Sequence, residues 1–258
     1  MDGLSFSMEK VCSGYGKRMV LERITGDIRS GKVTVLIGPN GSGKTTMLKT
    51  MAGVLPFDGR ISLMDRDLGG YSAGERGRLI GFAGQTPRMD SPFSVFEVVL
   101  MGRLPYINTL RGYSDRDRQE ALRAASAMRL EGMLHRPVRA LSGGEKQRVA
   151  LAQVLAQDTE VLLLDEPSSA LDPNHTLDLF STLRTLAATG KSVVLSVHDI
   201  NLAARFADDL WVLKNGKLLA RGAAYDILGP DLLFDTYDVP FACYRGEENN
   251  VWHVKEPN

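Results

Sequence analysis

A run of eight residues limits the possible folds of this chain more than any other feature. It reads Gly38-Pro39-Asn40-Gly41-Ser42-Gly43-Lys44-Thr45 and fits the pattern G-x-x-x-x-G-K-[ST] in full. The β-branched run Val33–Ile37 precedes it, and residues 45–52 read as a helix. The order of strand, glycine-rich loop and helix predicts an α/β fold in which the loop joins a buried strand to a helix.

The residue types of this loop suit the binding of phosphate groups. Glycines allow the backbone to curl so that its N–H groups converge on phosphate oxygens. The helix that begins near Lys44 directs its unpaired N–H groups and its positive dipole end at the same anion. Lys44 adds a point charge for the β- and γ-phosphates, and the Thr45 hydroxyl suits Mg²⁺. We therefore expect this loop and the next residue, Thr46, to bind ATP with Mg²⁺ (residues 38–46).

A second strand ends in two carboxylates. Residues 161–164 are apolar, and Asp165, Glu166 and Pro167 follow them. Open α/β sheets bind ligands at the carboxyl ends of their strands. We expect Asp165 to hold Mg²⁺ through water, and Glu166 to polarise the attacking water as a general base or by orienting it. The two motifs together predict a nucleoside triphosphatase of the P-loop class.

Strands and helices alternate elsewhere in the chain. Residues 192–197 read as a strand and residues 175–189 as the helix before it, which predicts a doubly wound parallel sheet. Residues 4–28 and 60–83 read as short strands of an N-terminal antiparallel sheet. Residues 92–139 read as helical, and we expect them to form an inserted α-helical subdomain.

The domain organisation follows from this insertion. We expect residues 1–91 and 140–258 to form the core with the antiparallel β-subdomain, and residues 92–139 to form the helical subdomain. Within the helical subdomain, Ser114 is expected to cap a helix over residues 115–128.

The end of the chain carries weaker signals. After residue 209 the sequence predicts two short strands around a turn at Asn215-Gly216, followed by a helical tail. The polar segment 246–258 contains Trp252 and either packs on the core or frays. The roughly forty residues after Leu219 leave no room for an additional β-barrel.

The composition limits the classes of partner that we expect for this chain. Lys and Arg total 31 and Asp and Glu total 31, so the basic surplus of a nucleic-acid-binding protein is missing and no nucleic-acid partner is expected. No run approaches the roughly 20 apolar residues that span a bilayer, and residues 1–10 lack the pattern of a secretory signal. We therefore expect any membrane role to be peripheral. Cys12 and Cys243 lie far apart and are expected to be reduced thiols.

A third motif points to one family. Leu141-Ser142-Gly143-Gly144-Glu145-Lys146-Gln147 closely resembles the LSGGQ signature of ABC ATPases, with Glu145 in place of the usual Gln. The local physics agrees, because Ser142 and two glycines open a helix to about Ala156, and its N-terminus offers a second anion site. The resemblance extends over nearly the whole chain.

The resemblance implies further site residues. Gln85, within Gly84-Gln85-Thr86-Pro87, matches the glutamine that contacts Mg²⁺ and the attacking water. His198 matches the switch histidine, Asp172 matches the D-loop, and Tyr15 matches the aromatic residue that stacks on adenine. Outside that family pattern, the residues alone fit a solvated glutamine, a structural histidine and a packing tyrosine.

The resemblance also implies the partners and the location. It implies a head-to-tail homodimer in which each ATP lies between Lys44 of one chain and residues Ser142, Gly143 and Gly144 of the other. It further implies integral membrane permease subunits, an indirect link to a substrate-binding protein, and a peripheral position on the cytoplasmic face of the inner membrane. Gln85 would link the nucleotide to the helical subdomain and the permease.

The transported substrate is indicated by one short element. Gly102-Arg103-Leu104-Pro105-Tyr106 resembles the ATPases of iron-chelate importers, which handle siderophores, haem and cobalamin. Molybdate importers share parts of the pattern, and the helical segment could instead follow the shape of the permease. Two rival functions remain, a non-transport ABC ATPase in DNA repair or translation and a scaffold with inactive sites. The latter disagrees with the presence of Lys44, Glu166 and His198.

Overall fold

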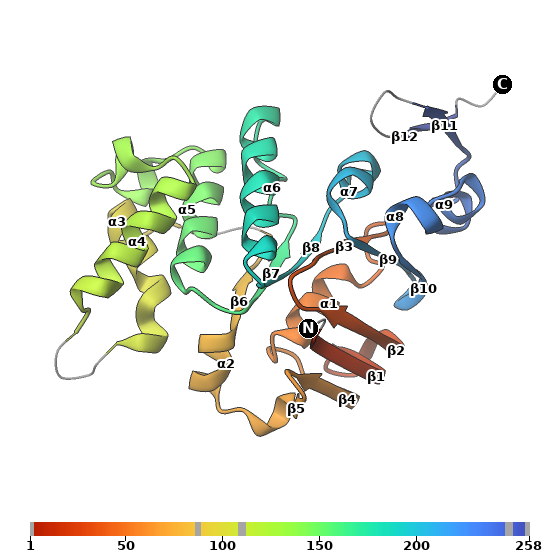
Figure 1. Ribbon diagram of the computed structural model, residues 1–258, viewed down its shortest axis with the longest axis horizontal. Helices are drawn as coiled ribbons and strands as arrows, with labels where there is room; N and C mark the ends of the chain where they lie inside the picture. The colour runs from red at the N-terminus through yellow and green to blue at the C-terminus, as the bar shows by residue number, and fades with distance from the viewer. Residues whose placement is uncertain (1–2, 86–88, 108–111, 246–249, 256–258) are drawn as a thin grey trace.

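A central sheet holds the phosphate loop in the middle of the molecule (Figure 1). The computed structural model describes residues 3–85, 89–107, 112–245 and 250–255. The strands of this sheet lie in the order β10-β9-β3-β8-β7-β6, and neighbours run parallel except for β10, which is antiparallel to β9. Their bounds are β3 Val33–Ile37, β6 Ile80–Ala83, β7 Val161–Asp165, β8 Ser192–Ser196, β9 Asp209–Lys214 and β10 Lys217–Gly222. The expected α/β fold is confirmed.

Both faces of the central sheet are covered by helices. Val33 and Val35 of β3 belong to the core beneath α6 (Pro173–Ala188), whereas Leu36 belongs to the core around α1 (Lys44–Met51). Alternate residues of a strand point to opposite faces, so a strand buried on both sides reads as a continuous apolar run. This explains why β3 and β7 show no polar alternation.

The antiparallel sheet covers the far side of α1. Its strands lie in the order β2-β1-β4-β5, with bounds β1 Leu4–Tyr15, β2 Arg18–Arg29, β4 Phe57–Leu63 and β5 Arg66–Asp67. Met47, Leu48 and Met51 of α1 share one buried cluster with this sheet. The expected N-terminal antiparallel sheet is therefore present, although β1 and β2 are long strands of 12 residues each.

The interpretation of residues 60–83 as antiparallel strands is wrong over its second half. Residues 68–70 form a 3₁₀ turn (Leu68–Gly70), α2 spans Ala73–Leu79, and β6 pairs in parallel with β7. A capping box starts α2, because the Ser72 hydroxyl accepts from the Glu75 N–H and the Glu75 carboxylate accepts from the Ser72 N–H at 2.7 Å. The S-x-x-E spacing was the missed signal.

Helices α3 (Val95–Leu100), α4 (Asp115–Ala127) and α5 (Gly143–Ala156) form a group at one end of the molecule (Figure 1). Three 3₁₀ helices join them, η2 Met101–Tyr106, η3 Glu131–Met133 and η4 Val138–Ala140. The Ser114 cap of α4 is confirmed, since its hydroxyl accepts from the Asp117 N–H at 3.2 Å. The group includes α5, which follows the predicted insertion; the boundaries at residues 91 and 140 stay a prediction.

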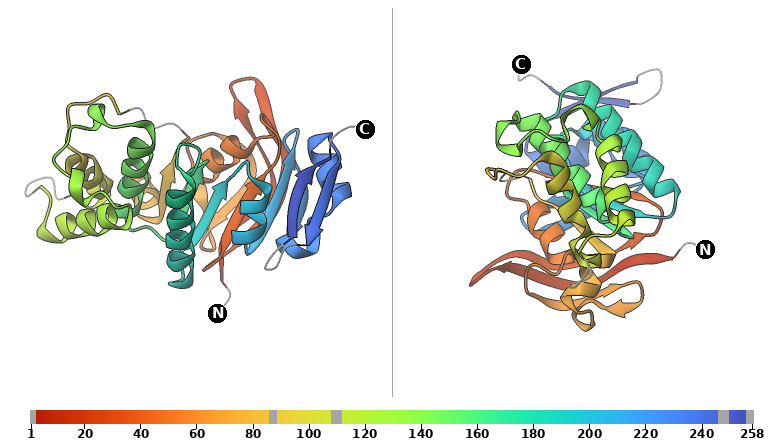
Figure 2. Two further views of the ribbon diagram at one scale, coloured as in Figure 1. Left: turned by 90° about the horizontal axis from the view of Figure 1, so that it is seen from above. Right: turned by 90° about the vertical axis from the view of Figure 1, so that its left-hand side faces the viewer.

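The C-terminal part lies at the opposite end (Figure 2). The turn at Asn215-Gly216 joins β9 to β10 as expected. Helices α8 (Ala224–Ile227) and α9 (Pro230–Tyr237) follow, but the chain then forms a two-stranded sheet, β11 Phe241–Arg245 and β12 Asn250–Val254. The expectation of a purely helical tail is wrong here, and Trp252 is buried in β12. Residues 246–249 and 256–258 of the predicted tail lie outside the described residues.

Candidate functional site

The backbone of the phosphate loop needs glycine at two points. Gly38 has a φ of 146°, and a Cβ there would lie 2.0 Å from the carbonyl oxygen of Leu213. Gly43 precedes α1 with a φ of 109°, and a Cβ there would lie 2.8 Å from Cδ2 of Leu21. Other residues rarely adopt such positive φ angles. The loop is therefore packed against β9 and β2, and it leads directly into the start of α1.

Lys44 is held inside this loop. Its side chain is buried, with 6% of the residue exposed, and Nζ donates to the carbonyl oxygens of Gly38 at 2.7 Å and Pro39 at 3.2 Å. Burial lowers the pKa of Lys44, while the nearby carboxylates of Glu166 and Asp165 oppose that effect. A buried ammonium ion is stabilised by anionic partners, so a phosphate group would complete its surroundings.

Two buried polar atoms near Lys44 have no hydrogen-bond partner among the described residues. They are Oγ of Ser42 and Oδ2 of Asp165. Buried polar atoms are normally paired, so both point to a ligand. A hydroxyl group can donate to a phosphate oxygen, and a carboxylate oxygen can accept from the water shell of a divalent cation. Mg²⁺ is held by one or two carboxylates with substrate phosphates, so the arrangement fits Mg²⁺ with a nucleotide.

Asp165 is oriented by a residue that sequence reasoning missed. Ser196, opposite Asp165 in the β7–β8 register, donates from Oγ to Oδ1 of Asp165 at 2.7 Å. The same Oγ accepts from the Glu166 N–H at 2.9 Å. One hydroxyl group therefore fixes both carboxylate residues. Its position as the last residue of a buried strand, two residues before His198, was the available signal.

Glu166 brings two distant residues together. Nε2 of Gln85 donates to Oε2 of Glu166, and Nε2 of His198 contacts Oε1 of the same carboxylate. Glu166 has a φ of 49°, a conformation that non-glycine residues adopt rarely and that clusters at active sites. Thr86 and Pro87, which follow Gln85, lie outside the described residues. A carboxylate held from both sides suits a group that must orient one water molecule.

These residues line one cleft of about 660 Å³. The predicted site residues along it are Tyr15, Asn40, Gly41, Gly43, Lys44, Thr45, Thr46, Gln85, Glu166 and His198. Tyr15 lies at the end of β1 with its ring half-exposed, and Nζ of Lys49 is 5.7 Å from the ring centroid. Arg18 and Val20 of β2 also line the cleft, and nothing in their sequence context predicted this.

The signature residues lie outside the part of this cleft that the structure describes. Ser142 and Gly143 are exposed at the N-terminus of α5. The Ser142 hydroxyl accepts from the Glu145 N–H at 3.3 Å, and Oε2 of Glu145 accepts from the Ser142 N–H at 2.7 Å. Hydrogen bonds from the Ser142 N–H and from the Ser142 side chain to the carboxylate lower the pKa of Glu145. The substitution of Gln by Glu145 therefore keeps a capping box at the start of α5.

Asp172 also lies outside the cleft as described. It caps α6, with Oδ1 accepting from the His175 N–H at 2.9 Å. Gly144 allows this segment to approach α5, since a Cβ there would lie 2.8 Å from the Ala170 carbonyl oxygen. The predicted site residues thus form two groups in one chain, one around the phosphate loop and one at the start of α5 and α6.

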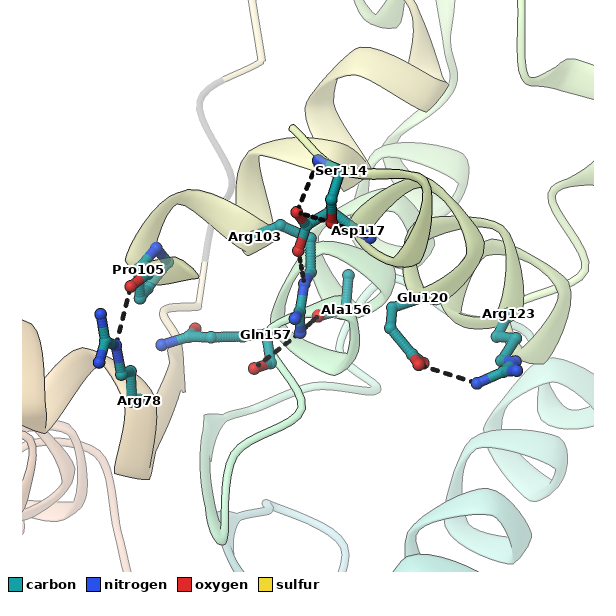
Figure 3. Close-up of polar contacts among 9 residues, drawn as sticks. All are labelled: Arg78, Arg103, Pro105, Ser114, Asp117, Glu120, Arg123, Ala156 and Gln157. Atoms are coloured by element: carbon teal, nitrogen blue, oxygen red, sulfur yellow. Dashed lines mark hydrogen bonds and ion pairs between the residues drawn. The ribbon is translucent and has the colours of Figure 1, made fainter. Parts of the chain in front are cut away.

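The Gly-Arg-x-Pro-Tyr element does not line the cleft as described. It packs the helices together through Arg103, which Figure 3 shows between Asp117 and Ala156. A Cβ on Gly102 would lie 2.0 Å from the Gln153 carbonyl oxygen, so η2 rests directly on the backbone of α5. The buried Arg103 donates from Nε to Oδ1 of Asp117 at 3.0 Å and from one terminal nitrogen to the Ala156 carbonyl oxygen at 2.9 Å. This element therefore joins α4 to the C-terminal end of α5.

Known proteins are similar in sequence to most of this chain. A model of the ABC transporter family matches residues 21–169. The iron(3+)-hydroxamate import ATP-binding protein FhuC of Bacillus subtilis (strain 168) is 36% identical over 237 residues, which are 91% of this chain and 88% of that protein. The hemin import ATP-binding protein HmuV of Rhodococcus jostii (strain RHA1) is 42% identical over 229 residues, which are 87% of this chain and 77% of that protein.

Solved structures share the fold. A chain of an inward-facing ABC transporter, described as of metal-chelate type, has a TM-score of 0.81 and 27% identity, covering 98% of this chain and 97% of that chain. A dimeric bacterial ABC transporter cassette has a TM-score of 0.76 and 27% identity, covering 85% of this chain and 98% of that one. The likeness therefore extends over both groups of site residues.

Proposed function

The chain belongs to the ABC transporter family, and we propose that it is the ATP-hydrolysing subunit of an importer for an iron chelate, a siderophore or haem complex, or for cobalamin. It is an ATPase of the kind that this family couples to transport. One observation carries the catalytic half of the proposal: a single cleft contains the buried Lys44 and a Glu166 carboxylate that contacts both Gln85 and His198. The iron-chelate cargo is inferred from the names of the two relatives, and cobalamin from the resemblance of the Gly-Arg-x-Pro-Tyr element.

We assign the roles of the residues by their chemistry. Lys44 and the loop N–H groups bind the β- and γ-phosphates, and Tyr15 offers its ring to the adenine. Thr45, Gln85 and Asp165 would hold Mg²⁺, which supplies charge for the leaving phosphates when bound. Glu166 accepts the proton of the attacking water or aligns it, and His198 holds Glu166 and contacts the γ-phosphate.

A dimer completes the site. ABC cassettes dimerise, as the bacterial cassette described above does. We propose that two copies pair head to tail, so that Ser142, Gly143 and Gly144 of one chain face the phosphate loop of the other. Supporting this, Ser142 and Gly143 are exposed at the N-terminus of a 14-residue helix, where unpaired N–H groups favour an anion. Asp172 caps α6, the next helix along the chain after α5, and would join this contact.

The membrane role is indirect. In the part of the chain that the structure describes, no helix is long and apolar enough to span a bilayer. The import names of the relatives support a membrane permease as partner. We propose that residues 92–139 form the subdomain that meets this permease at the cytoplasmic face of the inner membrane, and that a substrate-binding protein delivers the cargo.

Removal of the lysine charge tests the phosphate loop. Lys44→Ala should bind ATP roughly 10- to 100-fold more weakly, because a charge-assisted contact to the triphosphate is lost. Isothermal titration calorimetry with a non-hydrolysable ATP analogue and Mg²⁺ measures this affinity. Lys32→Ala is the control, since Lys32 lies just before β3 at the opposite end of the strand and is half-exposed. Wild-type affinity in Lys44→Ala would mean that the loop is assigned wrongly.

Uptake measurements test the cargo. In cells whose copy of the chain carries Glu166→Gln, uptake of labelled ferric hydroxamate, haem or cobalamin should fall to background. Uptake of labelled molybdate should stay at the wild-type level. If only molybdate uptake were lost, the cargo would be molybdate and not the proposed compounds. Normal uptake of all four compounds would contradict the importer proposal.

A further inference from the structure

The C-terminal hairpin, β11 and β12, has no part in the function proposed above. It lies at the end of the molecule away from α3, α4 and α5 (Figure 2). Its buried residues form a small apolar cluster of their own with α9, made by Leu233, Phe241 and Trp252. Ile200, the first residue of α7 (Ile200–Phe206), packs against this cluster. The hairpin therefore rests on the start of α7.

A pair of hydrogen bonds fixes this contact. Nδ2 of Asn201 donates to the Trp252 carbonyl oxygen at 3.1 Å, and the Trp252 N–H donates to Oδ1 of Asn201 at 2.7 Å. The carboxamide therefore pairs with β12 as the peptide group of a neighbouring strand would. Both atoms of the amide are used, and Trp252 is only 6% exposed. A shorter side chain would lose both bonds, and a carboxylate would lack the donor.

Asn201 lies three residues after His198. Between them, Asp199 caps α7, and its Oδ1 accepts from the Asn201 N–H at 2.8 Å and the Leu202 N–H at 3.1 Å. The cap, Ile200 and Asn201 form the first turn of α7, so a contact that fixes this turn fixes the backbone that leads to His198. β12 therefore contacts a residue that lies only three positions after His198 in the chain.

His198 depends on that backbone for its position. Its side chain is 49% exposed, and Nε2 reaches Oε1 of Glu166 on the adjacent strand end. A half-exposed imidazole is held in place less by packing than by the loop that carries it. A small displacement of a group that aligns the reactants lowers the rate of the chemical step more than it weakens substrate binding.

We propose that the C-terminal hairpin positions His198 for ATP hydrolysis, and that Asn201 is the positioning residue through which it acts. The inference depends on the role in hydrolysis proposed for His198. The hairpin contacts the first turn of α7, just after His198 in the same chain, so it sets the rate of hydrolysis without contacting the nucleotide. It is independent of the cargo, because the transported substrate enters none of these contacts.

Steady-state ATPase measurements on the full chain test the proposal. Asn201→Ala should lower kcat by about tenfold and leave KM for ATP within about twofold, because the phosphate loop is unchanged. Asn201→Asp, which keeps the size of the side chain and removes the donor, should also lower kcat. Tyr244→Ala is the matched control, since Tyr244 lies exposed on the same hairpin, and its kcat should equal that of the wild type.

A double-mutant cycle separates positioning from general damage. In a His198→Ala background, Asn201→Ala should cause no further loss of kcat, because its effect passes through the imidazole. A full additional loss in that background, or a rise in KM equal to the fall in kcat, overturns the proposal. If Asn201→Ala keeps the wild-type kcat while His198→Ala loses activity, the inference about the hairpin is wrong but the role of His198 stands. Unchanged kcat in both single variants overturns the role of His198 as well.

Discussion

Glu166→Gln should bind ATP with Mg²⁺ at near wild-type affinity and hydrolyse it roughly 10²- to 10⁴-fold more slowly. The amide has the shape of the carboxylate but cannot take a proton from water. The nitrogen of the new amide would also face Nε2 of Gln85 or of His198, and in the wild-type chain each of these atoms contacts a carboxylate oxygen of Glu166. Loss of one negative charge beside the γ-phosphate removes a repulsion, so the ATP-bound dimer should accumulate.

Two measurements check this expectation. Single-turnover hydrolysis gives the chemical rate, and size-exclusion chromatography with ATP shows the dimer. Glu160→Gln is the matched control, because exposed Glu160 lies just before β7, at the end of the strand opposite Glu166. Wild-type turnover in Glu166→Gln would contradict the role of Glu166. A persistent monomer with ATP would count against the shared site instead.

Much of the cleft could be predicted because its parts follow strands. The phosphate loop follows β3 and the two carboxylates follow β7, and only β8 separates these strands in the sheet. The carboxyl ends of parallel strands meet at one edge, so motifs far apart in sequence converge. Ser196 escaped prediction because its role depends on the β7–β8 register. Gln85 and His198 could be named from the family resemblance, whereas the residues alone left structural readings open.

Two parts of the fold escaped prediction for different reasons. Helix α2 had a local signal, the S-x-x-E spacing of Ser72 and Glu75, inside a segment dominated by short apolar runs. The C-terminal hairpin had a weak one. Residues 241–245 and 250–254 show little regular alternation, and what stabilises their arrangement is the docking of Trp252 on α7. Contacts between residues so distant in sequence cannot be read from periodicity.

Arg103→Ala should destabilise the protein by about 3–5 kcal/mol, because it leaves a buried carboxylate without its cation. Arg103 is 4% exposed and Asp117 is 5% exposed. Burial would raise the pKa of Asp117, but hydrogen bonds from Ser114 and the contacts of Arg103 outweigh it, and the pKa is lowered. The charged form is thus the stable one at neutral pH, and without Arg103 it keeps only the Ser114 bonds at 2.6 and 2.9 Å.

A second arginine, which lies on α4, provides the control (Figure 3). Arg123 pairs with Glu120 at 2.8 Å, but the Arg123 side chain is 71% exposed, so Arg123→Ala should change stability by less than about 1 kcal/mol. Urea unfolding followed by circular dichroism gives both free energies. Replacing the buried pair together, as Arg103→Met with Asp117→Leu, should recover much of the loss, since no buried charge is then left alone.

The stabilities of these arginine variants also decide what the Gly-Arg-x-Pro-Tyr element does. Arg103 binds the Ala156 carbonyl oxygen at the C-terminal end of α5, and Ser142 begins the same helix. If Arg103→Ala costs several kcal/mol while the double replacement keeps ATPase activity, the element is a packing device and its resemblance to iron-chelate importers follows from how these helices assemble. If Arg103→Ala and Arg123→Ala lowered the free energy of unfolding by equally small amounts, that explanation would be contradicted, because a buried ion pair would then behave like an exposed one.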